Sequence, residues 1–138
     1  MARKIGSVAL FRVNKMTLAE DATVPISKIP EMVRRIGRIK EKYKVPVYLL
    51  AHAGDGNMHP TFGYDPANAD ETQRVEKAIR ELFTASIELG GTLTGEHGIG
   101  LLKKGFLPLE VTEAEQQTWR NIKKSFDPEG ILNPGKFV

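Results

Sequence analysis

The apolar pattern of residues 70–89 constrains the fold of this 138-residue chain more than any other feature. Its apolar side chains recur every three or four residues, which predicts an amphipathic helix with one face on a core. The stripe consists of Val75, Ala78, Ile79, Leu82, Phe83 and Ile87. Gly90 and Gly91 follow it, and glycine commonly stands just past the end of a helix. Such a helix needs a second layer to cover its apolar face.

Two further stretches carry the same helical spacing. The first covers residues 28–43, and we predict that Ser27 is its N-cap because serine accepts hydrogen bonds from the first turn. The second begins where Thr112 and Glu115 form a capping-box pattern. The apolar face of this second helix consists of Trp119, Ile122 and Phe126. We expect the apolar face of each helix to lie in the core.

Short apolar runs between the helical stretches predict strands. Residues 47–50 form a run that is too short for a helix, and residues 58–63 are expected to return as a second strand after a glycine-rich turn. Residues 8–11 and 22–24 are predicted as two more short strands, the second ended by Pro25. Helices and short strands without a βαβ rhythm predict an α+β fold, a small antiparallel sheet with helices packed on one face.

The composition excludes several classes of protein. There is no cysteine, so any metal would be held by histidine and carboxylate rather than by thiolate. The net charge of +3 is too small to predict a nucleic-acid partner, although it favours small anions. No stretch approaches the roughly 20 apolar residues of a membrane span. The apolar run behind the basic start is too short for a signal peptide, so we expect a cytoplasmic protein.

All three histidines of the chain lie in two glycine-rich segments, where the helical and strand patterns break. His52 and His59 flank the first segment, and its glycine turn can bring them toward a common point. Imidazole is a common ligand for divalent metals, but two histidines alone make a poor site. Glu96 is the favoured third ligand, since two histidines and a carboxylate leave positions open for substrate or water. Asp55 is the alternative, although aspartate often bonds the backbone of its own turn.

The third histidine, His97, directly follows Glu96. If the backbone is extended here, the two side chains point to opposite sides, so that His97 would face a different part of the same cavity. Histidine titrates near neutral pH, which suits a general base. We therefore predict a role for His97 that is separate from metal binding.

Four motifs occur in an order typical of a known family. They are His-Ala-Gly-Asp-Gly-Asn-Met-His-Pro at 52–60, Gly-Glu-His-Gly-Ile-Gly at 95–100, Phe-Asp-Pro at 126–128 and Leu-Asn-Pro-Gly-Lys at 132–136. Together they resemble the C-terminal domain of FAD-linked oxidases. This group includes the FAD-linked subunit of glycolate oxidase, D-lactate dehydrogenases and D-2-hydroxyglutarate dehydrogenase. The resemblance covers nearly the whole chain.

The resemblance implies a ferredoxin-like cap domain over residues 1–138. FAD would be bound mainly by an N-terminal domain, which we expect to be absent from this chain. The chain would then be the substrate- and metal-binding domain of an FAD-dependent 2-hydroxy acid dehydrogenase or oxidase of the glycolate or D-lactate type. Such an enzyme oxidises a 2-hydroxy acid to the 2-oxo acid with hydride transfer to FAD, and the isolated chain would be inactive. The expected partners are the small 2-hydroxy acid and an FAD-binding domain or subunit, and a homo-oligomer is compatible with the sequence.

The same resemblance implies roles for single residues. His52, His59 and Glu96 match the family's ligands for a divalent metal, with zinc expected first and manganese or iron as alternatives. His97 matches the proposed catalytic base.

Two residues are candidates for binding the substrate. Arg3 matches an early arginine that would bind the substrate carboxylate, with Arg12 as a nearby alternative. Asn57, between the two histidine ligands, is the second candidate.

Two other functions stay open at this point. A metal site of two histidines and a glutamate could hydrolyse an ester or amide, although no H-E-x-x-H motif is present. The chain could also be a flavoprotein-docking or metal-binding module without activity of its own.

Overall fold

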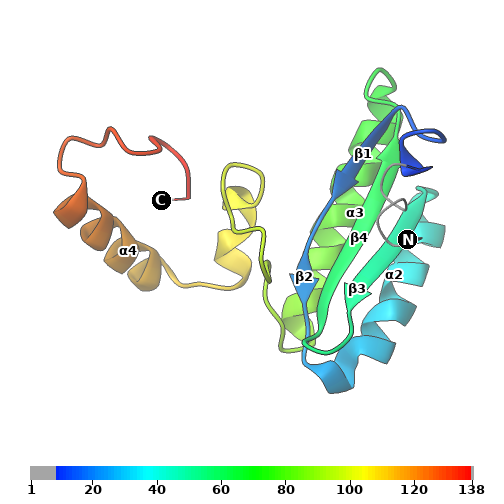
Figure 1. Cartoon of the computed structure of the whole chain (residues 1–138), viewed down its shortest axis with the longest axis horizontal. Coiled ribbons are helices and arrows are strands. Elements are labelled where there is room, and N and C mark those ends of the chain that lie inside the picture. The colour runs from blue at the N-terminus through cyan, green and yellow to red at the C-terminus, as the bar shows by residue number, and fades with distance from the viewer. Residues whose placement is uncertain (1–8, 138) are drawn as a thin grey trace.

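The structure, a computed structural model, describes residues 9–137 (Figure 1). The strands in this part are β1 (Met16–Ala19), β2 (Ala22–Thr23), β3 (Val47–His52) and β4 (Asn57–Tyr64). The α-helices are α2 (Ile29–Tyr43), α3 (Ala69–Glu88) and α4 (Glu113–Phe126), and the 3-10 helices are η1 (Ile26–Lys28) and η2 (Lys104–Leu109). None of the helices in this range is long and apolar enough to cross a membrane.

The sheet is antiparallel and is centred on β4. On one side β4 pairs with β3, and on the other it pairs with β1 and then β2, which lie end to end. One further bridge joins Thr23 of β2 to Thr92, after α3. The order is therefore β-α-β-β-α with a single bridge in place of a last strand, which is the ferredoxin-like arrangement. The predicted α+β fold is confirmed.

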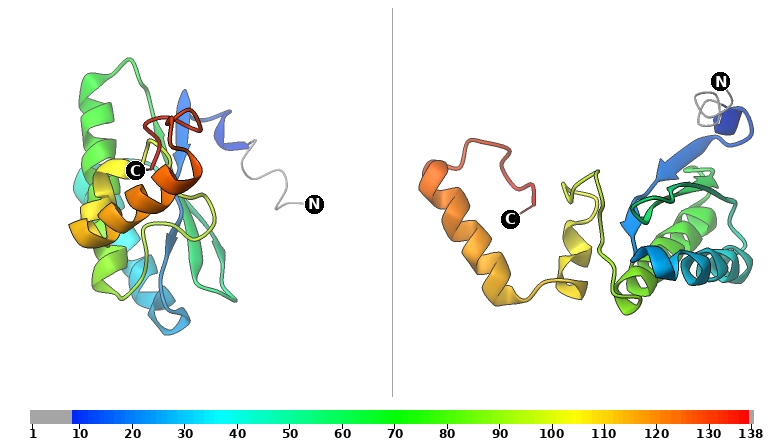
Figure 2. Two further views of the ribbon diagram at one scale, coloured as in Figure 1. Left: turned by 90° about the vertical axis from the view of Figure 1, so that its left-hand side faces the viewer. Right: turned by 60° about the horizontal axis from the view of Figure 1, so that its bottom comes forward.

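Helices α2 and α3 lie together on one face of this sheet (Figure 2). Met58 and Phe62 of β4 point to that face and are fully buried, together with Met32 and Leu82 from the helices. Because side chains alternate along a strand, His59 lies on the opposite face. Leu50, which pairs with His59, is 49% exposed, so this second face is open over β3.

A proline explains why β1 and β2 are two strands rather than one. Ala19 pairs with Thr61 and Ala22 with Met58, so an unbroken register would place Glu20 opposite Pro60 and Asp21 opposite His59. Glu20 does donate its N–H to the Pro60 carbonyl at 3.0 Å. Proline has no N–H to return, so the ladder is interrupted at this position.

The predicted start of the chain needs correction. Of the strand expected at 8–11, Val8 lies outside the described residues, while Ala9 and Leu10 are helical and Phe11 begins a turn. The prediction is wrong because Arg12 and Val13 donate to carbonyls three residues back, which closes a turn. The strand predicted at 22–24 is confirmed in β2.

The helical and hairpin predictions for the middle of the chain are confirmed by α2, β3, β4 and α3. Gly90, with φ of +79°, follows α3 in the left-handed conformation that glycine adopts readily. The prediction of Ser27 as an N-cap is wrong. Residues 26–28 form η1 instead, and the N-cap of α2 is Lys28, without a side-chain hydrogen bond.

The last helix is capped as predicted but is not buried as predicted. Thr112 and Glu115 form both hydrogen bonds of a capping box at the start of α4. However, Ile122 is 53% and Phe126 83% exposed, and Trp119 stacks on Phe137 rather than in the core. Figures 1 and 2 show why: residues 113–137, here named the C-terminal arm, extend away from the sheet.

Candidate metal centre

The turn of the β3–β4 hairpin brings His52 and His59 together. The His52 carbonyl accepts the N–H groups of Asp55 and Gly56, and the Asp55 carboxylate accepts the N–H of Asn57 at 3.0 Å. Gly56 has φ of +83°, and a Cβ there would overlap the Val24 carbonyl. Asp55 therefore stabilises the turn by a hydrogen bond, which is the role that the sequence offered as the alternative to metal binding.

The two imidazoles lie on the open face of the sheet. Their ring centres are 5.1 Å apart, with the ring planes at 87°. The His59 side chain is 15% exposed and that of His52 is 38% exposed. Both histidines are therefore held by paired strands yet accessible to a ligand from solvent.

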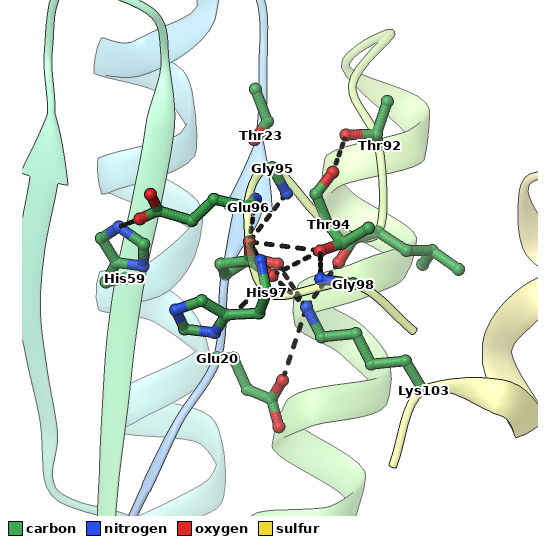
Figure 3. A network of polar contacts seen from close by, with 12 residues as sticks. Glu20, Thr23, His59, Thr92, Thr94, Gly95, Glu96, His97, Gly98 and Lys103 are labelled. Carbon is green, nitrogen blue, oxygen red and sulfur yellow. Dashed lines mark hydrogen bonds and ion pairs between the residues drawn. The ribbon is translucent and has the colours of Figure 1, made fainter. Parts of the chain in front are cut away.

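Glu96 reaches His59 from the glycine-rich loop after α3 (Figure 3), and its carboxylate also lies near His52. One carboxylate oxygen lies 2.9 Å from Nε2 of His59 and 3.4 Å from Nε2 of His52. Ligand atoms of the three residues all lie within 4.8 Å of one another. Ligands at zinc distances in a tetrahedral site lie about 3.3 Å apart. The donor set and its spacing therefore fit a divalent metal with small movements.

His97 lies beside this set. Its ring stacks on His59, with centres 5.2 Å apart and planes at 23°. Its Nδ1 lies 3.9 Å from an oxygen of Asp21, and its side chain is 44% exposed. The backbone here is bent rather than extended, so Glu96 and His97 both reach the neighbourhood of His59 instead of diverging.

A buried acid that the sequence did not single out underlies the loop. Asp21 is fully buried and accepts the N–H groups of three successive residues, 95–97. Its other oxygen is bonded to the ammonium group of the buried Lys103. Burial opposes the ionisation of Asp21, but the hydrogen bonds from Lys103, Glu96 and His97 outweigh it and hold the pKa well below its usual range. No local signal marks this role, apart from an acidic pair standing directly before a short apolar run.

The neighbouring acid, Glu20, has the opposite electrostatic environment. Its side chain points to the helix side of the sheet, into a pocket that Arg80 and Phe106 also line. Burial raises its pKa to about 7, the negative charge of Asp21 adds to the rise, and Lys103 at 3.9 Å partly offsets it.

Of the two predicted substrate-binding residues, Asn57 lies within the described part of the chain. Asn57 is 5% exposed, and its side-chain oxygen accepts a hydrogen bond from Thr23 at 3.2 Å. In this structure it braces β2 against β4, next to Gly95, where an added Cβ would overlap it. Arg3 lies outside the described residues, and Arg12 is exposed on the N-terminal turn.

Comparison with known proteins identifies relatives along almost the entire chain. Residues 2–137 match the family model described as FAD linked oxidases, C-terminal domain. The chain is 47% identical over 135 residues to the glycolate oxidase subunit GlcD of Bacillus subtilis (strain 168), with 98% of this chain and 29% of that protein covered. It is 35% identical over 136 residues to the GlcD subunit of Escherichia coli (strain K12), with 99% and 27% covered.

Relatives of lower identity include proteins named as D-lactate dehydrogenases. The mitochondrial D-lactate dehydrogenase [cytochrome] of Arabidopsis thaliana is 34% identical over 118 residues, with 86% of this chain and 21% of that protein covered. The chain thus spans between about a fifth and a third of the length of these relatives. On the match of residues 2–137 and these identities, the chain belongs to the family of FAD linked oxidases, C-terminal domain.

Proposed function

We propose that this chain is the substrate- and metal-binding domain of an FAD-dependent enzyme that oxidises a 2-hydroxy acid of the glycolate or D-lactate type. The observation that carries the proposal is the convergence of His52, His59 and Glu96 on the open face of the sheet, with His97 stacked beside them. The names of the relatives support the class of substrate, since they include glycolate oxidase subunits and D-lactate dehydrogenases.

The metal-binding part of the proposal concerns three side chains. His52, His59 and Glu96 would hold a divalent cation, zinc in the first place, with manganese or iron as alternatives. A bound cation supplies positive charge that lowers the pKa of a coordinated hydroxyl group. Three protein ligands leave coordination positions for the hydroxyl and carboxylate oxygens of a 2-hydroxy acid.

His97 would take the hydroxyl proton of the substrate. Its Nδ1 faces the Asp21 carboxylate at 3.9 Å, which leaves Nε2 on the other side of the ring. Nε2 is then the nitrogen available as the base. Asn57 and Arg3 stay our candidates for binding the substrate, and a guanidinium group suits the substrate carboxylate.

An electron acceptor must come from outside the described site. FAD, held by a separate FAD-binding domain, would supply that chemistry when present. Large apolar side chains are exposed on and near the C-terminal arm, and such surface often marks a partner site. They are Leu101, Leu102, Phe126 and Ile131, each between 64% and 83% exposed. We therefore expect the chain alone to be inactive.

Metal binding is the first test. Metal-free protein without a histidine tag is titrated with Zn²⁺ by calorimetry, as wild type, His59→Ala, Glu96→Gln and His97→Gln. We expect one equivalent in the wild type and a loss of affinity of at least about 10²-fold in the two ligand variants. His97→Gln is the matched control and should bind zinc within a few-fold of wild type. Absence of binding in the wild type would mean that the three residues are only hydrogen-bonding groups.

Turnover with the FAD-binding domain tests the rest. The chain is combined with an FAD-binding domain and assayed on glycolate and D-lactate with an artificial electron acceptor. His97→Gln should reduce turnover by about 10²-fold or more if it is the base. Undiminished turnover would remove His97 from the mechanism, and no turnover in any combination would favour a binding module without chemistry.

A further inference from the structure

The loop of residues 94–98, which carries Glu96 and His97, is wound around one buried carboxylate (Figure 3). A single oxygen of Asp21 accepts the N–H of Gly95 at 2.8 Å, of Glu96 at 2.6 Å and of His97 at 2.8 Å. Successive backbone N–H groups that converge on one anion form a concave binding site for it. Here the anion belongs to the protein itself, 74 to 76 residues earlier in the chain.

Two side chains complete this arrangement. The Thr94 hydroxyl donates to Asp21 at 2.9 Å and accepts the N–H of Gly98 at 2.8 Å, which ties both ends of the loop to the same acid. Lys103 donates to the Asp21 carboxylate, to the Asp21 carbonyl at 2.9 Å and to the Leu93 carbonyl at 2.9 Å. The ammonium group thus has three acceptors, as a buried charge requires.

We propose that Asp21, paired with Lys103, is a positioning residue that holds the backbone of residues 94–98 so that Glu96 and His97 meet His59. This inference rests on the proposed function, because the positions of Glu96 and His97 matter only if they act as metal ligand and base. The sheet register places Asp21 opposite His59. The acid that holds the loop therefore lies in the gap between β1 and β2, beside the part of β4 that carries the histidine the loop must reach.

The loop needs such an anchor for a physical reason. Glycines at 95 and 98 give its backbone many accessible conformations, and Glu96 is 54% exposed, so packing of its own side chain does not hold it. Ligands that are preoriented by partners outside the coordination sphere bind metal more tightly, typically by about 10- to 100-fold. Asp21 supplies that preorientation through backbone N–H groups rather than through the ligand side chains.

The test compares two anchor variants with two matched controls in the full chain. Asp21→Glu keeps the charge for Lys103 but moves the carboxylate, and Thr94→Val removes the hydroxyl with little change of shape. Asp127→Glu makes the same change at an acid that pairs with Lys123 in the C-terminal arm, and Thr118→Val removes a hydroxyl that donates to Ala114 within α4. The readouts are the Zn²⁺ Kd by calorimetry, the visible spectrum of the Co²⁺ form and, without metal, amide hydrogen exchange at residues 95–97.

We expect Asp21→Glu to weaken Zn²⁺ binding by about 10-fold or more and Thr94→Val by about 3- to 10-fold, with an altered Co²⁺ spectrum. Both should speed exchange of the 95–97 amides, while the two controls stay within about 2-fold of wild type. If Asp21→Glu does not fold by circular dichroism, Thr94→Val carries the test.

Failure of this inference differs from failure of the proposed function. Unchanged Kd and unchanged exchange in both anchor variants would overturn the positioning role and leave the metal site intact. If wild type binds no metal, the metal part of the proposed function fails, and the metal-free exchange decides the anchor alone. Faster exchange then supports the positioning role, and unchanged exchange overturns it.

Discussion

Helices α3 and α4 carry the same kind of amphipathic pattern but have different surroundings. In the body of the protein, residues 16–93, α3 buries its apolar stripe against the sheet and α2. In the C-terminal arm, none of the residues of α4 is buried. An apolar stripe therefore predicts which face of a helix seeks cover, but not whether the described part of the chain supplies that cover.

The largest expected effect comes from removing a core leucine from the body. Leu82 is fully buried, so Leu82→Ala should lower the free energy of unfolding by about 3–5 kcal/mol through lost burial and a residual cavity. Urea unfolding followed by circular dichroism measures this. A cost below about 1 kcal/mol would mean that the body is not packed as described.

The second expected effect is a pH dependence that belongs to the body alone. The pKa of Glu20 is raised from 4.5 to about 7 in the folded state. Its contribution to stability is thus fully present below pH 4.5 and is lost as the pH rises through 7. Glu20→Gln, which cannot ionise, should therefore gain about 3 kcal/mol relative to wild type between pH 4.5 and pH 8. Urea unfolding of both proteins at the two pH values gives the difference, and parallel pH profiles would contradict it.

Helix caps in the two regions provide a third, smaller test. Asn68 caps α3 by accepting the N–H groups of Asp70 and Glu71, and Thr112 caps α4 within its capping box. Each substitution by alanine should cost about 1 kcal/mol locally. Asn68→Ala should shift the global unfolding midpoint, whereas Thr112→Ala should mainly speed hydrogen exchange in the first turn of α4. Equal global shifts would show that arm and body unfold as one unit.

The smallest expected effect is the counterpart of the first. Leu132 in the arm is 59% exposed, so Leu132→Ala should change the free energy of unfolding by less than about 0.5 kcal/mol. The same urea experiment measures it. A cost near that of Leu82→Ala would break the comparison, because the arm would then have to be covered in solution, for example by a second copy of the chain.

Local patterns predicted much of the fold and the grouping at the centre of the site. Helical spacing located α2, α3 and α4 to within a few residues, because a periodic stripe is a property of neighbouring positions. The histidines were informative because glycine-rich segments hold all three of them. The hairpin turn then leaves His52 and His59 on one face. The exposed face of α4 was not predictable, since burial depends on what packs against a helix.

What the sequence by itself determined are the helices, the hairpin and the candidate ligands His52, His59 and Glu96. Only the tertiary structure decided the different roles of Glu20 and Asp21, which are neighbouring acids in the sequence. Alternation of side chains between β1 and β2 turns Glu20 toward a pocket beside α3, where burial raises its pKa, and turns Asp21 under the loop of residues 94–98. The physical reason is distance along the chain: strand pairing and loop closure, not local propensity, bring Asp21 to N–H groups more than 70 residues away.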